Sequence, residues 1–160
     1  MEDIFFNSKE FKDNLSLYEN SRKEGKVCIL SSDELTDIAD YYDSRSMKEA
    51  AVEAAGYAIK LYPGASSPLL FMARMMACSD KDSQKARWYL EKVTDTDYAD
   101  YFSVNAEVCL LEENCKEALE WLREGERTLE DDEDRLDLFY DAAYMLVDYG
   151  FAEEARNGRT

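Results

Sequence analysis

The side chains of this chain that could do chemistry are carboxylates and thiols, because the sequence contains no histidine. Histidine is the commonest general base and the commonest metal ligand in proteins. Carboxylate pairs such as Asp40 and Asp43 are the remaining acid–base candidates, but 36 of the 160 residues are Asp or Glu, so a pair carries almost no information. A catalytic thiol needs a basic partner, which histidine would normally supply. We therefore expect no enzymatic activity and no catalytic residues.

The four cysteines are Cys28, Cys78, Cys109 and Cys115. None of them forms a C-x-x-C pair, so the sequence predicts neither a zinc knuckle nor a thioredoxin-like redox site. Cys109 and Cys115 are six positions apart, which is a poor spacing for two metal ligands on one helix. We expect four free thiols in a reducing compartment, mostly buried as small apolar residues, and neither a metal nor another cofactor.

The charge of the chain limits its possible ligands. With 19 basic and 36 acidic residues the formal net charge is −17, which repels the phosphate backbone and makes nucleic acid an unsuitable partner. A surface of this sign attracts basic partners, although a solvated helical surface without a specific partner would have the same composition. No stretch reaches the roughly 18 apolar residues of a membrane span, and the N-terminus lacks the pattern of a secretory signal. These observations predict a cytoplasmic protein that does not bind membranes.

A short sequence motif that begins with alanine is repeated along the chain. Ala51, Ala86, Ala118 and Ala155 open similar segments, at spacings of 35, 32 and 37 residues. Self-similarity at this period is typical of arrays of helix pairs, which mostly bind other proteins. The fourth copy is cut short, so either the array ends there or the natural chain is longer. The low content of glycine and proline, 6 and 2 residues, also favours helix.

Helix start signals recur as well. The capping-box pattern, an Asn or Ser followed three residues later by Glu, begins at Asn7, Ser31, Ser46 and Asn114. Gly25, Pro63-Gly64 and Tyr149-Gly150 are stop signals. These signals and the apolar spacing predict an all-α chain with helices at about 8–24, 32–44, 46–62, 67–78, 82–94, 98–112, 114–129, 134–149 and from 151 onward.

The sequence allows two further predictions for the C-terminal helices. Phe139, Ala142, Ala143 and Leu146 have the i, i+3, i+4, i+7 spacing of a buried helix face. The acidic run 130–134 is interpreted as a linker that stabilises the start of the next helix through its dipole. A loose divalent-cation site is the alternative for this run, but the glycine and alternating ligands of an EF-hand loop are missing.

The repeated units resemble the tetratricopeptide repeat, a 34-residue helix pair with small and bulky residues at fixed positions. The matching positions are Leu35, Ile38, Ala39, Tyr42, Ala51, Ala55, Ala58 and Pro63 in the first unit; Leu70, Ala73, Ala77, Ala86, Leu90 and Val93 in the second; Phe102, Ala106, Ala118, Leu122 and Gly125 in the third; and Phe139, Ala142, Ala143, Leu146 and Ala155 in the fourth. Arg74 and Asn105 depart from the pattern. A related two-helix repeat is the alternative.

The resemblance, which covers about residues 32–156, implies a right-handed α-α superhelix of about four helix pairs in a single domain. Its repeats would span 31–64, 65–97, 98–131 and 134–160, and residues 1–30 would form an N-terminal capping helix. Small residues at the matching positions would let helix backbones approach closely.

In this family the first helix of each pair lines a concave groove that holds a ligand peptide. The corresponding positions here are Thr36, Asp40 and Asp43; Phe71, Met75 and Cys78; Ser103, Glu107 and Leu110; and Tyr140, Tyr144 and Val147. The resemblance thus implies a scaffold or adaptor that binds a basic or apolar segment of another protein in an acidic and aromatic groove.

Asp40 and Glu107 would repel the C-terminal carboxylate that some members of the family bind.

Two alternatives stay open. Phe71, Met75, Leu110 and Val147 could be core residues, and the chain could be a spacer or a self-associating module, such as a homodimer, without a peptide ligand. Trp88 and Trp121 are expected to be packing residues.

Overall fold

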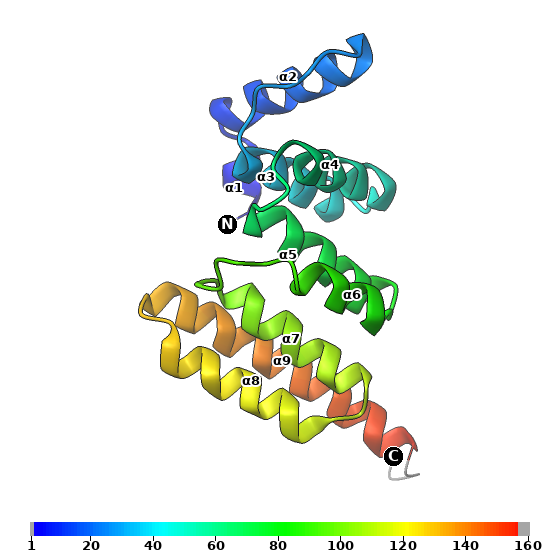
Figure 1. Cartoon of the computed structure of the whole chain (residues 1–160), viewed down its shortest axis with the longest axis vertical. Coiled ribbons are helices and arrows are strands. Elements are labelled where there is room, and N and C mark those ends of the chain that lie inside the picture. The colour runs from blue at the N-terminus through cyan, green and yellow to red at the C-terminus, as the bar shows by residue number, and fades with distance from the viewer. Residues whose placement is uncertain (1, 157–160) are drawn as a thin grey trace. The chain divides into compact units, whose positions relative to one another are not determined.

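The computed structural model describes residues 2–156, and this part of the chain is all-α, with nine α-helices, one π-helix and no strand. The chain forms two compact units that divide between Met72 and Ala73. Neighbouring helices run antiparallel, which is the usual result of short connections (Figure 1). No helix within the described residues is long and apolar enough to cross a membrane.

The first unit is built around the antiparallel pair α3 (Ser32–Ser44) and α4 (Lys48–Leu61). Their contact buries Leu35 and Ile38 of α3 completely, together with a row of α4 alanines in which Ala51 and Ala58 are also fully buried. Alanine has no bulk beyond its Cβ atom, so the two backbones can approach closely. The recurring alanines of the sequence therefore mark a real helix–helix contact in this pair.

Two further helices precede this pair, α1 (Glu2–Phe6) and α2 (Lys9–Glu24), and α5 (Ser66–Arg74) follows it. The sequence did not predict α1. Phe6 at its end packs on Phe11 of α2, with ring centroids 5.0 Å apart. Gly25 ends α2 in the left-handed conformation at φ 68°, as its position in the sequence predicts.

The apolar run 27–30 is a non-helical segment. Two tyrosine hydroxyls of the first unit hold its backbone. The amide of Cys28 donates to the Tyr57 hydroxyl at 2.8 Å, and the Tyr62 hydroxyl donates to the carbonyl of Leu30 at 2.7 Å. Cys28 and Leu30 are buried. The segment is thereby fixed against the first unit without forming a sheet.

The second unit contains η1 (Met75–Ser79), α6 (Ser83–Leu90), α7 (Ala99–Leu111), α8 (Cys115–Thr128) and α9 (Asp132–Arg156). Helix α7 contacts all the others and is the most buried of them. Its core includes Phe102, Ala106 and Cys109, which pack with Leu122 of α8 and Leu138 of α9. Trp121 packs against this core as expected, whereas Trp88 is 56% exposed and lies under the Lys92 ammonium instead.

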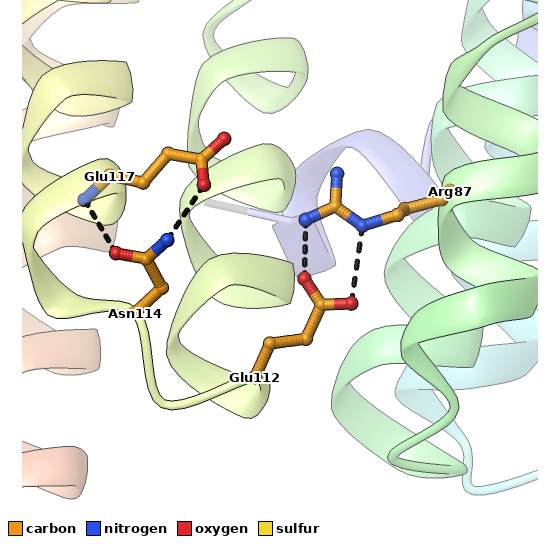
Figure 2. A network of polar contacts seen from close by, with 4 residues as sticks. All are labelled: Arg87, Glu112, Asn114 and Glu117. Atoms are coloured by element: carbon orange, nitrogen blue, oxygen red, sulfur yellow. Dashed lines mark hydrogen bonds and ion pairs between the residues drawn. The ribbon is translucent and has the colours of Figure 1, made fainter.

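An ion pair between side chains joins α6 to the end of α7 (Figure 2). The Arg87 guanidinium donates from both Nε and Nη2 to the two carboxylate oxygens of Glu112. The hydrogen bond from Arg87 lowers the pKa of Glu112. Beyond this pair, Asn114 caps α8, because its Oδ1 accepts from the Glu117 amide at 3.1 Å while its Nδ2 donates to the Glu117 carboxylate at 2.8 Å. The loop between α7 and α8 is thus fixed at both ends.

Two of the predicted capping boxes do not form at the predicted residue. Ser31 and Glu34 form the full reciprocal box at the start of α3, as predicted. At α2, however, the cap is Ser8 rather than Asn7, and it accepts from the Phe11 amide. At α4 there is no side-chain cap, because Ser46 has a φ of 59° and the helix begins after Met47. In both cases the sequence pattern is present, but the backbone enters the helix one residue later.

The sequence predicts a regular helix over 67–78, but α5 ends at Arg74. From Met75 the chain widens into the π-helix η1, with the Asp80 amide donating to the carbonyl of Met75 at 3.2 Å. The chain then turns at Lys81, which has a φ of 54°. A π-turn inserts one extra residue into the helical ladder and changes the direction of the side chains that follow.

The prediction of a helix break at Gly150 was wrong, because α9 runs without interruption from Asp132 to Arg156. A glycine weakens a helix by about 1 kcal/mol but does not end it unless its backbone leaves the helical region. The acidic run 130–134 is a linker only in part, because Asp132, Glu133 and Asp134 already form the first turn of α9, where the helix dipole favours acidic side chains.

The predicted buried face of α9 was wrong except at Ala142, which is partly buried against the core. Leu138 and Met145 face the core of the second unit, whereas Phe139 and Leu146 are 65% and 45% exposed and Ala143 is exposed. The helix carries two apolar stripes one residue apart, and the spacing could not show which one the core would use.

Candidate functional site

A cleft of about 270 Å³ lies in the second unit. Helix α7 contributes Ser103, Val104 and Glu107, and α9 contributes Asp141, Tyr144, Met145 and Asp148. Both sets have the i, i+4 spacing of one helix face. Arg74, Cys78 and Lys81 complete the wall from η1 and its flanks.

The floor of the cleft is closed by packing. Ser103, Val104 and Met145 are 3%, 2% and 7% exposed, and Met145 belongs to the core cluster of the unit. The third wall depends on the π-helix, because η1 carries Cys78 and leads directly to the left-handed turn at Lys81. Single π-turns are frequent at functional sites, since they redirect side chains that a regular helix would place elsewhere.

Arg74 forms the basic end of the cleft. Its guanidinium pairs with Asp100 at the start of α7 and lies 3.7 Å from the Asp141 carboxylate of α9. Burial raises the pKa of Asp141, and the charge of Arg74 opposes this shift. Arg74 thus links α7 to α9 and already has two carboxylate neighbours of its own.

Glu107 also lines the cleft and is hydrogen-bonded to Tyr149 of α9. The Tyr149 hydroxyl donates to Glu107 Oε1 at 3.3 Å. Burial raises the pKa of Glu107, while Lys81 and the Tyr149 hydrogen bond lower it. Burial, followed by the charge of Glu107, also raises the pKa of the Tyr149 hydroxyl. Glu107 therefore carries a charge that has lost part of its water and that a further cation would stabilise.

The Cys78 thiol faces the same space, but its environment does not activate it. Burial and then the charge of Glu107 raise its pKa, and Arg74 and Lys81 only partly offset this. The thiol therefore stays protonated near neutral pH, whereas a nucleophilic cysteine needs a lowered pKa. The cleft therefore offers three carboxylates, two basic side chains and the aromatic ring of Tyr144, which is 75% exposed.

The structure brings four of the sequence-predicted groove residues together here, namely Cys78, Ser103, Glu107 and Tyr144. Tyr140 and Val147, each 55% exposed, are also on α9 but do not line the cleft. Met75, Leu110 and Phe71 are buried, at 5%, 5% and 6%, so they are core residues, which is the alternative that the sequence left open. Val147 is not a core residue.

The remaining predicted residues lie on α3 of the first unit. Asp40 and Asp43 are exposed there. Thr36 is 9% exposed and its hydroxyl donates to the carbonyl of Ser32 at 2.7 Å, so its polar atom is used within its own helix. No group of three or more potential metal ligands occurs among residues 2–156, so the acidic run 130–134 gives no sign of a cation site in the part described.

Sequence reasoning missed Arg74, Lys81, Asp141 and Asp148 as members of the cleft. Arg74 had a signal, because it departs from the small residue that the repeat pattern prefers. Asp141 and Asp148 also had one, since they are three residues before and four residues after Tyr144 and so share its helix face. Lys81 had none, because its placement depends on the π-turn.

Comparison with protein-family models, with curated proteins and with solved structures finds no match to this chain.

Proposed function

We propose that this chain is a protein-interaction module, a scaffold or adaptor of tetratricopeptide-like repeats, that binds a basic and apolar segment of a partner protein through the cleft between α7, α9 and η1. One observation carries the proposal. Three carboxylates, Glu107, Asp141 and Asp148, outnumber the two basic residues Arg74 and Lys81 in the cleft lining, which also holds the 75% exposed Tyr144 and the buried Val104 and Met145. Exposed aromatic side chains beside partly desolvated charges are typical of protein interfaces.

The electrostatics favour a basic ligand. Glu107 and Asp141 both have pKa values raised by burial, so a lysine or arginine side chain from a partner would replace some of the water that they have lost. An anionic ligand would have to compete with Asp100 and Asp141 for Arg74. The net charge of −17 adds long-range attraction for a basic segment.

The repeat architecture is supported by burial at the positions that the pattern assigns to close helix contacts. Ala39, Ala51 and Ala106 are fully buried, and Ala118 is 1% exposed. Gly125 is equally constrained, because it packs against Phe102 and Leu138. Arrays of this kind present their first helices as a binding surface, and Glu107 and Tyr144 are on such helices.

Binding of defined 15-residue peptides tests the proposal. One peptide alternates Lys or Arg with Leu and Phe, and its control has Glu in place of every basic residue. We expect the basic peptide to bind in the micromolar range, more weakly as salt is added, and the acidic peptide not to bind. The variant Glu107→Gln with Tyr144→Ala should bind about tenfold more weakly.

The matched control removes an acidic and an aromatic side chain elsewhere in the second unit, with Glu120→Gln and Trp88→Ala. Both residues are exposed and neither lines the cleft. This variant should bind the basic peptide as wild type does. Equal binding by the two variants, or no binding by wild type, would contradict the proposal and leave the structural spacer as the better interpretation.

A further inference from the structure

A second concave surface lies between α8 and α9, apart from the cleft. It is a groove of about 550 Å³, lined mainly by apolar side chains. The groove includes Leu119 of α8 and Leu136, Phe139 and Leu146 of α9, which are 38%, 51%, 65% and 45% exposed. Large apolar side chains gathered this way on an exposed face mark an interaction site rather than a solvated surface.

The spacing of these residues indicates what shape of partner fits. Leu136, Phe139 and Leu146 are three and seven residues apart, so they form one stripe along α9 beside the stripe of Leu138 and Met145 that faces the core. Stripes with this period pack against another helix, which lies in the groove between two helices. From Asp132 to Leu146 the groove extends over about 21 Å, which is four helical turns.

Charged residues are ordered along the groove. Helices α8 and α9 are antiparallel neighbours joined by a short turn (Figure 1). Nearest to this turn are two acidic residues, Glu126 and Asp132. Three residues further along each helix are two arginines, Arg123 and Arg135. The apolar residues lie beyond the arginines. From the turn outward, the groove therefore has an acidic layer (Glu126 and Asp132), a basic layer (Arg123 and Arg135) and an apolar stripe.

We propose that this groove binds an amphipathic helix of another protein whose facing side carries a basic residue, then an acidic residue one turn further, then an apolar stripe. A helix with this order places opposite charges against both layers while its apolar side chains cover Phe139 and Leu146. The site is separate from the cleft around Glu107, so the chain can bind two segments at once.

A second copy of the chain does not fit this order. An antiparallel pairing that sets Leu136 of one copy against Leu146 of the other sets Arg135 and Asp132 against Val147 and Gly150, without charge partners. A parallel two-fold pairing sets Arg135 against Arg135 and Asp132 against Asp132. Like charges that face each other at an interface are unfavourable. The net charge of −17 on each copy adds further repulsion.

Two 18-residue helical peptides of identical composition test the proposal with the full chain. Both carry the same leucine stripe, preceded by one basic and one acidic residue a helical turn apart. In one peptide the basic residue comes first and the acidic residue is next to the stripe, and in the other the two are exchanged. We expect the peptide with the matching order to bind about tenfold more tightly, because four surface charge pairs change sign between the two. Phe139→Ala with Leu146→Ala should abolish this binding, whereas Tyr144→Ala should leave it unchanged.

The exchange of charges on α8, Arg123→Glu with Glu126→Arg, keeps the net charge and reverses half of the order. We expect this variant to bind the two peptides equally well. Equal binding of both peptides by wild type, or binding that survives Phe139→Ala with Leu146→Ala, would overturn the proposal. Sedimentation supplies the remaining test, since a wild-type dimer that dissociates in that double variant would assign the groove to a second copy.

Discussion

The Tyr149 hydroxyl of α9 donates to Glu107 Oε1 of α7 at 3.3 Å, which connects two helices through residues 42 positions apart. The bond lowers the otherwise raised pKa of a partly buried carboxyl. We expect Tyr149→Phe to reduce the free energy of unfolding at pH 7 by about 1 kcal/mol, because Glu107 loses a donor. Urea unfolding measures this, and Tyr140→Phe, on an exposed ring of the same helix, should stay within about 0.5 kcal/mol of wild type. An equal loss in both would show that the bond contributes nothing.

Asp37 of α3 predicts a pH dependence of stability. Burial, with smaller contributions from the charges of Asp33 and Glu34, raises its pKa from 3.8 to about 6. Between those two values the folded state binds more protons than the unfolded state, so stability falls as pH rises from about 4 to 6. Asp37→Asn should remove this decrease and raise stability at pH 7 by about 1 kcal/mol, a figure discounted for solvent screening of a half-exposed group.

Thermal unfolding at pH 4.5 and pH 7 checks the Asp37 prediction. Asp43→Asn on the same helix is the matched control, because Asp43 is exposed and its removal changes the net charge equally. Only the Asp37 variant should change the difference between the two pH values. If both variants shift stability alike, the general reduction of negative charge is the cause and burial of Asp37 is not.

The sequence was sufficient to predict the helical class and most of the helices, because capping and periodicity are local properties. Ser31 with Glu34, Asn114 and Gly25 act where the pattern placed them. The choice between two stripes on α9 is different, since it depends on which residues α7 and α8 present. Leu138 and Phe139 are adjacent in sequence, yet one is 3% and the other 65% exposed.

The cleft was predictable only in part for a related reason. Glu107 and Tyr144 were named from the resemblance to the repeat, and both line the cleft. Asp141 and Asp148 share a helix face with Tyr144, so they could have been found in the same way. Lys81 depends on the π-turn at η1 and on a φ of 54°, and no local pattern indicated either of them.

Ser31 and Ser46 both begin a predicted capping box, but only Ser31 forms one. Ser31 accepts from the Glu34 amide at 3.1 Å, and Glu34 accepts from the Ser31 amide at 2.9 Å. Ser31→Ala should therefore cost about 1 kcal/mol of stability. Ser46→Ala should change stability by less than about 0.5 kcal/mol, because α4 has no side-chain cap. Urea unfolding of both variants measures the change in stability. A comparable loss of stability in Ser46→Ala would mean that the predicted capping box at Ser46 does form.

Gly125 and Gly56 are both helical glycines, but their surroundings predict opposite effects for the same substitution. A Cβ atom at Gly125 of α8 would lie 2.6 Å from Leu138 Cδ2 and 2.8 Å from Phe102 Cγ, whereas one at Gly56 of α4 would meet nothing within 4 Å. We expect Gly125→Ala to destabilise the protein by about 1–3 kcal/mol, because the α7–α9 core must move apart. Gly56→Ala should stabilise it by about 0.5–1 kcal/mol through helix propensity alone. Denaturant midpoints of the two variants measure these effects, and a stabilised Gly125→Ala protein would show that α8 has room for a methyl group against α7 and α9.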